Sequence, residues 1–200
     1  MSRIRQHVNP LTARHLARRP PPLALPAGRP VEVELGCGDG QFLFERARAA
    51  PDGFYVGVEI RQEWVDRIAR ADVENVIAVN ANLLVAPVMF PPESVTRFHV
   101  NFPDPLFKLR QRRRRWLTPE IASRLADALV PRGEIFFQSD VFETALDALD
   151  VLEGCARLHN AAGEWRFARA NPYGARSRRE VGCEEEGARI WRLRFAKVAA

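Results

Sequence analysis

The chain has 200 residues, of which 46% are apolar, and this is typical of one globular domain with a sizeable core. Its net charge is +5 and its pI is about 9.7, which favours an anionic partner such as nucleic acid over an acidic protein. No apolar run is long enough to span a bilayer, so the sequence predicts no membrane segment.

Residues 1–30 form a basic, proline-rich segment ahead of the first predicted strand. The stretch from Met1 to Val31 contains no acid, six arginines and six prolines. Prolines break the amphipathic helix that a transit peptide needs, so we expect a loosely ordered arm that contacts nucleic acid, with a functionless tail as the alternative. Residues 31–200 are expected to form one domain, because no repeat or linker divides them.

Strands and helices are predicted to alternate along that domain. Short β-branched and aromatic runs predict strands over residues 31–35, 54–60, 76–79, 95–102 and 133–139, a sixth strand starting at Arg166, and a closing strand over 190–198. Helices are expected over residues 41–49, 63–71, 119–129 and 142–152. This alternation predicts an α/β fold with an open, mostly parallel sheet.

Polar residues recur at the predicted ends of successive strands. They are the segment from Glu34 to Gly40, then Glu59, Asn82, Asp104 and Asp140. Ligands of open parallel sheets bind outside the carboxyl ends of the strands. The five positions therefore predict a binding site along one edge of the sheet.

The first of these segments is a glycine-rich loop, ELGCGDG. Glycine permits positive φ and lets a ligand approach the backbone, which makes Gly36 and Gly38 candidates for cofactor binding. Glu59 follows the loop by about twenty residues, the position from which a carboxylate can accept the hydroxyls of a ribose.

Two cofactors compete for such a loop. A nicotinamide enzyme normally shows G-x-G-x-x-G, which leaves a helix N-terminus open to pyrophosphate. Here the loop carries the acids Glu34 and Asp39. Carboxylates suit an ammonium and a sulfonium better than a pyrophosphate, so the pattern favours S-adenosylmethionine and resembles the first motif of Rossmann-like methyltransferases.

The stretch from Asn101 to Trp116 joins an acid to a cationic run. Asp104 stands between two prolines, which restrict the backbone around its carboxylate. Six cations follow, and such a run is suited to binding phosphates, although a solvated helix face or a nuclear-import signal would look the same. The six are Lys108, Arg110, Arg112, Arg113, Arg114 and Arg115.

This stretch resembles the FPDPW-x-K-x-R-x-x-R-R signature of the bacterial tRNA (guanine-N7)-methyltransferase family. The likeness covers nearly the whole chain and includes ELGCGDG, GVEI, SDVFETA around Asp140, and the S-R-R-E segment from Ser177 to Glu180. It implies a single Rossmann-like class I methyltransferase domain, with a mostly parallel seven-stranded sheet and an antiparallel strand near the C-terminus. It also implies S-adenosylmethionine as cofactor and tRNA as substrate.

The resemblance also implies roles for single residues. Cofactor contacts are implied at Glu34, Glu59, Asn82 and Asp104. Contacts with tRNA or guanine are implied at six residues: Lys108, Asp140, Ser177, Arg178, Arg179 and Glu180. From the cationic run we add Arg112, Arg113 and Arg114 as further contacts with tRNA.

Three positions depart from the family pattern. Leu106 replaces the usual Trp, Asn82 the usual Asp, and Ser177 the usual Thr. None of them removes a group that the chemistry needs, although Leu106 would change the packing under the guanine.

The expected reaction needs no general base, because N7 of guanine carries a lone pair and no proton. We therefore expect Asp104 to stabilise the charge that develops on the ring, with Asp140 and Glu180 accepting from the N–H donors of the base. A non-catalytic RNA-binding module and a nicotinamide oxidoreductase remain as alternatives.

Neither cysteines nor histidines form a recognisable site. The three cysteines are odd in number and widely spaced, and the four histidines show no ligand spacing. We therefore expect no metal, no disulfide framework and a reducing, cytoplasmic compartment. The protein is expected to be a monomer or a homodimer.

Overall fold

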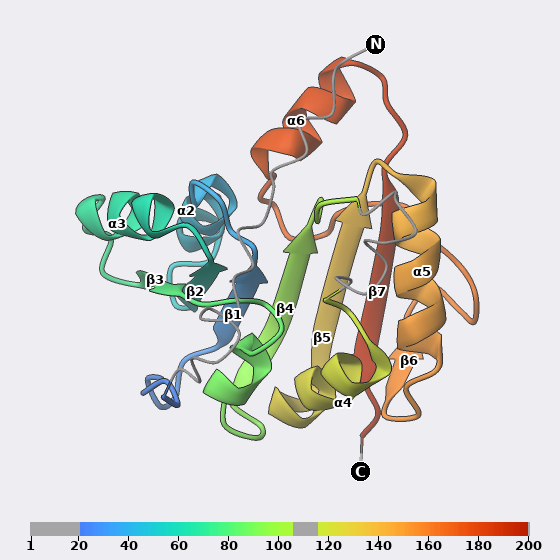
Figure 1. Ribbon diagram of the computed structural model, residues 1–200, viewed down its shortest axis with the longest axis horizontal. Helices are drawn as coiled ribbons and strands as arrows, with labels where there is room; N and C mark the ends of the chain where they lie inside the picture. The colour runs from blue at the N-terminus through green and yellow to red at the C-terminus, as the bar shows by residue number, and fades with distance from the viewer. Residues whose placement is uncertain (1–20, 106–115, 200) are drawn as a thin grey trace.

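The computed structural model describes residues 21–105 and 116–199. Within these residues, seven strands form one sheet in the order β3-β2-β1-β4-β5-β7-β6 (Figure 1). The strands are β1 (Val31–Leu35), β2 (Phe54–Glu59), β3 (Val76–Asn80), β4 (Val95–Asn101), β5 (Leu129–Ser139), β6 (Leu158–Asn160) and β7 (Trp191–Lys197). The first five pair in parallel, and β7 runs antiparallel to both β5 and β6, which confirms the predicted fold class.

The helices pack on the sheet in two groups (Figure 1). They are α2 (Gln41–Ala49), α3 (Gln62–Arg70), α4 (Pro119–Ala128), α5 (Phe142–Glu153) and α6 (Arg178–Glu185), with a 3-10 turn η1 (Ala86–Met89). Helices α2 and α3 contact β2 and β3, whereas α5 contacts β5, β6 and β7. Helix α6 lies beyond the arrowheads of β4 and β5, at the carboxyl edge of the sheet (Figure 1).

Alternation along β1 places apolar and acidic side chains on opposite faces of the sheet. Val31, Val33 and Leu35 of β1 belong to the main hydrophobic core, which also takes in buried residues of α4 and α5. The intervening Glu32 and Glu34 are buried on the opposite face. Successive side chains of a strand point to opposite faces, so β1 supplies both the core and acidic groups on the other side of the sheet.

One predicted strand is wrong. The sixth strand was expected to start at Arg166, but β6 lies earlier, at Leu158–Asn160, and Ala168 makes only an isolated bridge to Arg192 of β7. A strand of three residues is too short to show a period of two, so its sequence carries no readable signal.

Part of the predicted arm packs against the domain. Leu23 and Leu25 lie against the hydrophobic core, and the Leu23 amide donates to the carbonyl of Met89 at 2.8 Å. Arg29 donates to three carbonyls of residues 51–53. Residues 21–30 are therefore attached to the fold, and the predicted boundary after residue 30 stays a prediction.

Candidate active site

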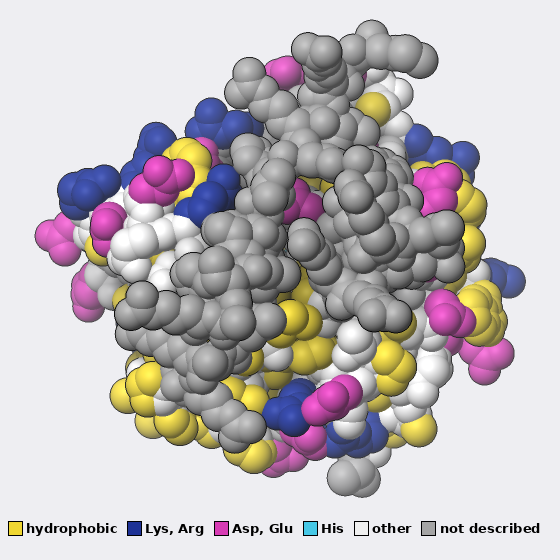
Figure 2. All heavy atoms as spheres, in the orientation of Figure 1, with side chains coloured by type: hydrophobic (Ala, Val, Ile, Leu, Met, Phe, Trp, Pro, Cys, Tyr) yellow, Lys and Arg dark blue, Asp and Glu magenta, His cyan; other side chains and the backbone are white. Residues whose placement is uncertain are grey.

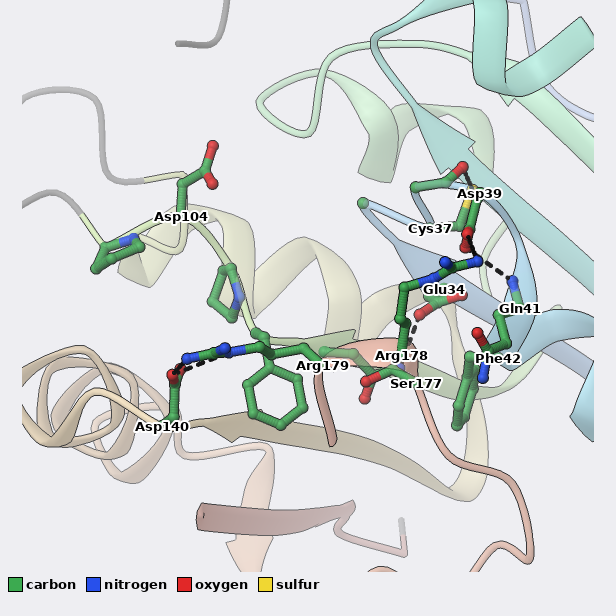
Figure 3. Close-up of a pocket in the computed structure, with 16 residues that line it drawn as sticks. Glu34, Cys37, Asp39, Gln41, Phe42, Asp104, Asp140, Ser177, Arg178 and Arg179 are labelled. Carbon is green, nitrogen blue, oxygen red and sulfur yellow. Dashed lines mark hydrogen bonds and ion pairs between the residues drawn. The ribbon is translucent and has the colours of Figure 1, made fainter. Parts of the chain in front are cut away.

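A pocket of about 400 Å³ opens at the carboxyl ends of β1, β4 and β5 (Figure 3). The glycine loop, the segment after β4, Asp140 and the start of α6 form its walls. It brings together eight of the predicted site residues: Glu34, Gly36, Gly38, Asp104, Asp140, Ser177, Arg178 and Arg179. Glu59, Asn82 and Glu180 do not line it.

The glycine loop turns sharply out of β1. Gly36 and Gly38 have φ of 84° and 53°, in the left-handed region that glycine adopts at no steric cost. The amides of Gly36 and Cys37 both donate to the Val58 carbonyl, at 2.8 and 3.1 Å, and so tie the loop to β2. A Cβ atom added at Gly38 would meet nothing within 4 Å, so the loop leaves open space where a ligand can approach the backbone.

Glu59 lies behind this loop. Its carboxylate accepts from the amide of Gly38 at 3.0 Å and from the amide and side chain of Arg61. The side chain is buried and fixes the glycine loop to the end of β2. In this structure Glu59 therefore holds the glycine loop in place, and its expected contact with a ribose stays a prediction.

Glu34 is buried at the floor of the pocket with one oxygen unsatisfied. Oε1 accepts from Asn101 Nδ2 at 2.8 Å, whereas Oε2 has no hydrogen-bond partner among the described residues. Burial raises the pKa of this carboxyl to about 8, and the nearby carboxylates of Asp39 and Glu59 act in the same direction. A bound cation would satisfy the free oxygen and relieve this cost.

Asn82 also has an unsatisfied polar atom. It is buried after β3, where Oδ1 accepts from the Leu84 amide at 3.0 Å, and Nδ2 has no partner in the part of the chain described. The site therefore has a buried acceptor at Glu34 and a buried donor at Asn82 without protein partners. The ammonium and the adenine of S-adenosylmethionine offer the complementary groups, so these residues fit that cofactor.

Two ion pairs connect α6 to the pocket walls (Figure 3). Arg178 Nη2 lies 2.5 Å from Asp39 Oδ2 on the glycine loop, and Arg179 Nη2 lies 2.5 Å from Asp140 Oδ2 after β5. Ser177 caps the helix, since its Oγ accepts from the amide of the third helical residue at 3.2 Å. The S-R-R-E segment thus closes one side of the pocket.

Glu180 is fully buried beneath the pocket. Its carboxylate accepts from Gln138 Nε2 at 2.8 Å, from Arg192 Nη2 at 3.0 Å and from Asn171. Gln138 Nε2 also donates to Asn101 Oδ1 at 2.9 Å. A continuous row of hydrogen bonds therefore runs from Glu34 through Asn101 and Gln138 to Glu180, and the predicted contact of Glu180 with guanine stays untested.

Asp104 is exposed on the segment that follows β4. Figure 3 shows its carboxylate across the opening from Asp39 and Glu34. Phe102, two residues earlier, has φ of 50°, a rare conformation for a bulky side chain, and its amide donates to the Gln138 carbonyl at 2.8 Å. The backbone that leads to Asp104 is therefore held in a strained turn at the pocket wall.

Four predicted site residues of the cationic run lie outside the described residues, as does Leu106; they are Lys108, Arg112, Arg113 and Arg114. On the coloured part of the face in Figure 2, Lys and Arg side chains are mixed with Asp and Glu at the margins.

In the described ranges no three His, Cys, Asp or Glu side chains group as metal ligands, and no helix is long and apolar enough to cross a bilayer.

Sequence reasoning missed the residues that connect the two ends of the site. Asn101 ends β4 and Gln138 is the penultimate residue of β5, and the two are paired across the strands. The sequence held part of the signal for these two residues, since a side-chain amide at the carboxyl end of a parallel strand lies on the edge of the sheet where ligands bind. Their partnership with Glu180 depends on the path of the chain between β6 and β7, which no local pattern predicts.

Comparisons with known proteins agree with this geometry. A family described as "Putative methyltransferase" matches residues 28–193. The "tRNA (guanine-N(7)-)-methyltransferase" of Synechococcus sp. (strain JA-3-3Ab) is 35% identical over 203 residues, covering 95% of this chain and 84% of that protein. The protein with the same description in Anaeromyxobacter dehalogenans (strain 2CP-C) is 38% identical over 177 residues, covering 86% and 88%.

Solved structures show the same fold. The 16S rRNA methyltransferase KamB has a TM-score of 0.61 with 17% identity, over 84% of this chain and 88% of that chain. The aminoglycoside resistance methyltransferase NpmB1 has a TM-score of 0.57 with 21% identity, over 85% and 88%. These neighbours establish the methyltransferase fold of the domain.

Proposed function

This chain belongs to the tRNA (guanine-N(7)-)-methyltransferase family, and we propose that it transfers a methyl group from S-adenosylmethionine to N7 of a guanine in tRNA, in the variable loop. The observation that carries the proposal is the match to relatives of that description along nearly the whole of both chains. Two buried atoms without partners among the described residues support it, because Oε2 of Glu34, which lines the pocket, and Nδ2 of Asn82, which does not, fit groups of the cofactor.

The cofactor is S-adenosylmethionine, which supplies an electrophilic methyl group on a sulfonium. In the proposed arrangement Glu34 accepts from the ammonium, and Gly36 and Gly38 leave room for the ligand beside the loop. Glu59 reaches the ribose from behind the loop while holding it, and Asn82 donates to the adenine. The free Oε2 of Glu34 and the free Nδ2 of Asn82 support these assignments.

The catalytic proposal rests on the chemistry of guanine N7, which is nucleophilic without deprotonation. The protein then has to align N7 with the methyl group and stabilise the positive charge that spreads into the ring. We assign that stabilisation to Asp104, whose carboxylate faces the opening from a strained, proline-flanked segment. Because N7 of guanine carries no proton for Asp104 to remove, the role of this carboxylate is electrostatic.

Recognition of the base is assigned to Asp140, in line with the family resemblance. Arg179 donates twice to the carboxylate of Asp140, and both bonds use Oδ2. This leaves Oδ1 to accept from an N–H of guanine, while Arg179 fixes the orientation of the carboxylate. Ser177 and Arg178 line the same wall. Glu180, which is buried behind it, is assigned to the base edge on the family resemblance alone. Lys108 with Arg112 to Arg114 are assigned to the tRNA backbone.

The decisive experiment combines labelled S-adenosylmethionine with unmodified tRNA and maps the methylated position. We expect label on N7 of one guanine in the variable loop. Methylation of another atom or of no RNA would contradict the proposal. Titration with S-adenosylmethionine and NAD in parallel separates it from a nicotinamide oxidoreductase, and cofactor binding without turnover would indicate a non-catalytic RNA-binding module.

Compartment and assembly follow from the proposed substrate. An enzyme that modifies tRNA is expected in the cytoplasm. The site is built within one chain, which is compatible with either a monomer or a homodimer.

A further inference from the structure

The structure has a second pocket, of about 600 Å³. It is lined by residues of the segment that connects β6 to α6 and by Arg194 of β7. Three of its lining residues are arginines, Arg166, Arg169 and Arg194, and none is an acid. The other described lining residues are Phe167, Pro172 and four alanines. Small side chains beside three guanidinium groups leave room for a bulky anion.

Arg194 is held in position from below. Its Nε donates to Glu134 Oε1 at 2.7 Å, and its Nη2 lies 2.5 Å from the same oxygen. Arg97 pairs with the other oxygen of Glu134 and also with Glu32, which accepts from Arg46 as well. Three guanidinium groups thus share two carboxylates, so the cluster that holds Arg194 has a formal charge of +1.

Arg166 and Arg169 add two further positive charges to the lining of this pocket. Both are exposed, and neither forms an ion pair with any residue that the structure describes. The backbone that carries them is fixed, because Asn160 Nδ2 donates to the Arg166 carbonyl at 2.9 Å and the Ala168 amide donates to the Arg192 carbonyl at 2.7 Å. The segment that carries the two arginines is therefore tied by its backbone to both β6 and β7.

The second pocket lies close to the first along the chain. Five residue steps separate Pro172, which lines the second pocket, from Ser177, which lines the first, so their Cα atoms are at most about 18 Å apart. Arg176 is exposed on this connection. A nucleic acid that places a base in the first pocket has neighbouring backbone within reach of the second.

We propose that Arg166, Arg169 and Arg194 form a binding site for a phosphodiester group of the RNA substrate, next to the nucleotide that enters the first pocket. The inference rests on the proposed function, since it assumes that the substrate is RNA. It adds an anchoring site separate from the cationic run of residues 108–115. Guanidinium groups bind phosphate oxygens in a bidentate manner and release counterions on contact.

The test compares two variants of the full chain that remove the same charge. One is R166Q/R169Q, and the matched control is R124Q/R132Q, whose positions are on α4 and near the start of β5, away from α6 (Figure 1). Binding of unmodified tRNA is measured over a range of salt concentrations, and methylation kinetics are measured with tRNA varied. Thermal unfolding of both variants checks that they are folded.

We expect R166Q/R169Q to weaken tRNA binding about tenfold and to lower the slope of log K against log salt by about 1 to 2, because each phosphate contact contributes nearly one unit. KM for tRNA rises, whereas kcat and the affinity for S-adenosylmethionine stay unchanged. Equal effects of the two double variants on affinity and slope would overturn the site while leaving the proposed function standing. If the unaltered protein neither binds nor methylates tRNA, the proposed function itself fails, and the phosphodiester site with it.

Discussion

Glu34→Gln is expected to make the cofactor-free protein more stable at neutral pH while it removes cofactor binding. Glu34 is buried, one of its oxygens has no partner among the described residues, and its pKa is raised to about 8 from an ordinary 4.5. Glutamine keeps the shape and an acceptor for Asn101 Nδ2 but carries no charge. The substitution therefore isolates the cost of burying the carboxylate.

The sign follows from the protons bound in each state. Between pH 4.5 and 8 the folded protein keeps a proton on Glu34 that the unfolded chain has lost. The free energy of unfolding therefore falls as pH rises through that range, by up to about 1.4 kcal/mol per pH unit. From pH 5 to pH 8 the fall attributable to Glu34 amounts to about 3 kcal/mol, or roughly 10 °C in the melting temperature of a domain of this size.

Urea denaturation at half-unit steps from pH 5 to pH 8 measures this slope for the unaltered protein, for Glu34→Gln, and for the exposed control Glu120→Gln. The difference between the first two isolates Glu34, because the other titrating groups are common to both. We expect the Glu34→Gln curve to be flatter by the amount given above, and the control to follow the unaltered protein. Parallel curves for all three proteins would refute the argument that Glu34 is buried with a raised pKa.

The same carboxyl predicts a proton exchange on cofactor binding. Pairing with an ammonium lowers the pKa of an acid, so at pH 7 the unaltered protein releases a proton from Glu34 when S-adenosylmethionine binds. Calorimetry in buffers of different ionisation enthalpy detects this release. A binding enthalpy that is independent of the buffer would place the ammonium elsewhere.

Three further predictions test other parts of the site. Asp104→Ala should abolish turnover while leaving cofactor affinity measurable by titration, and methylation at the unaltered rate would remove Asp104 from catalysis. Gly57→Ala should lower the free energy of unfolding, measured by urea denaturation, by about 1 to 3 kcal/mol, because the added Cβ would lie 2.5 Å from Cys37 Sγ. The control Gly182→Ala adds a Cβ with nothing within 4 Å and should be neutral or stabilising. Neutralising Arg112 to Arg115 should flatten the salt dependence of tRNA binding without changing cofactor affinity, and an unchanged slope would identify a solvated face.

The bounds of strands and helices were predicted well where a short apolar run of sequence is followed by a clear turn. The strand over residues 31–35 and the helix over residues 41–49 have the predicted bounds. The fifth strand was predicted to start at Gly133 but starts at Leu129. Pro131 lies in that extension and Arg132 has φ of 63°, so the local sequence indicates a turn. Leu129 nevertheless pairs with Val95 of β4, and the register shifts before Glu134 pairs with Arg97.

Helix α6 was not predicted, although the sequence carried a signal for its start. Ser177 and Glu180 have the spacing of a capping box, and Ser177 does cap the helix. The side chain of Glu180, however, reaches under the pocket to Gln138 and Arg192. Family resemblance identified the segment as functional, but only the tertiary contacts show that one of its residues is part of the protein interior.

The placement of α6 depends on this buried acid. Only Glu180 and Cys183 are buried in the helix, so its apolar contacts with the sheet are few. Hydrogen bonds to a charged group contribute about 1.5 to 3 kcal/mol each, and removal of the acid would take this acceptor away from the buried Gln138 and the partly buried Arg192. A Glu180 substitution can thus displace Arg178 and Arg179 and impair activity without any contact between Glu180 and the base. Loss of activity in such a variant assigns Glu180 to guanine only if the free energy of unfolding and the cofactor affinity are both unchanged.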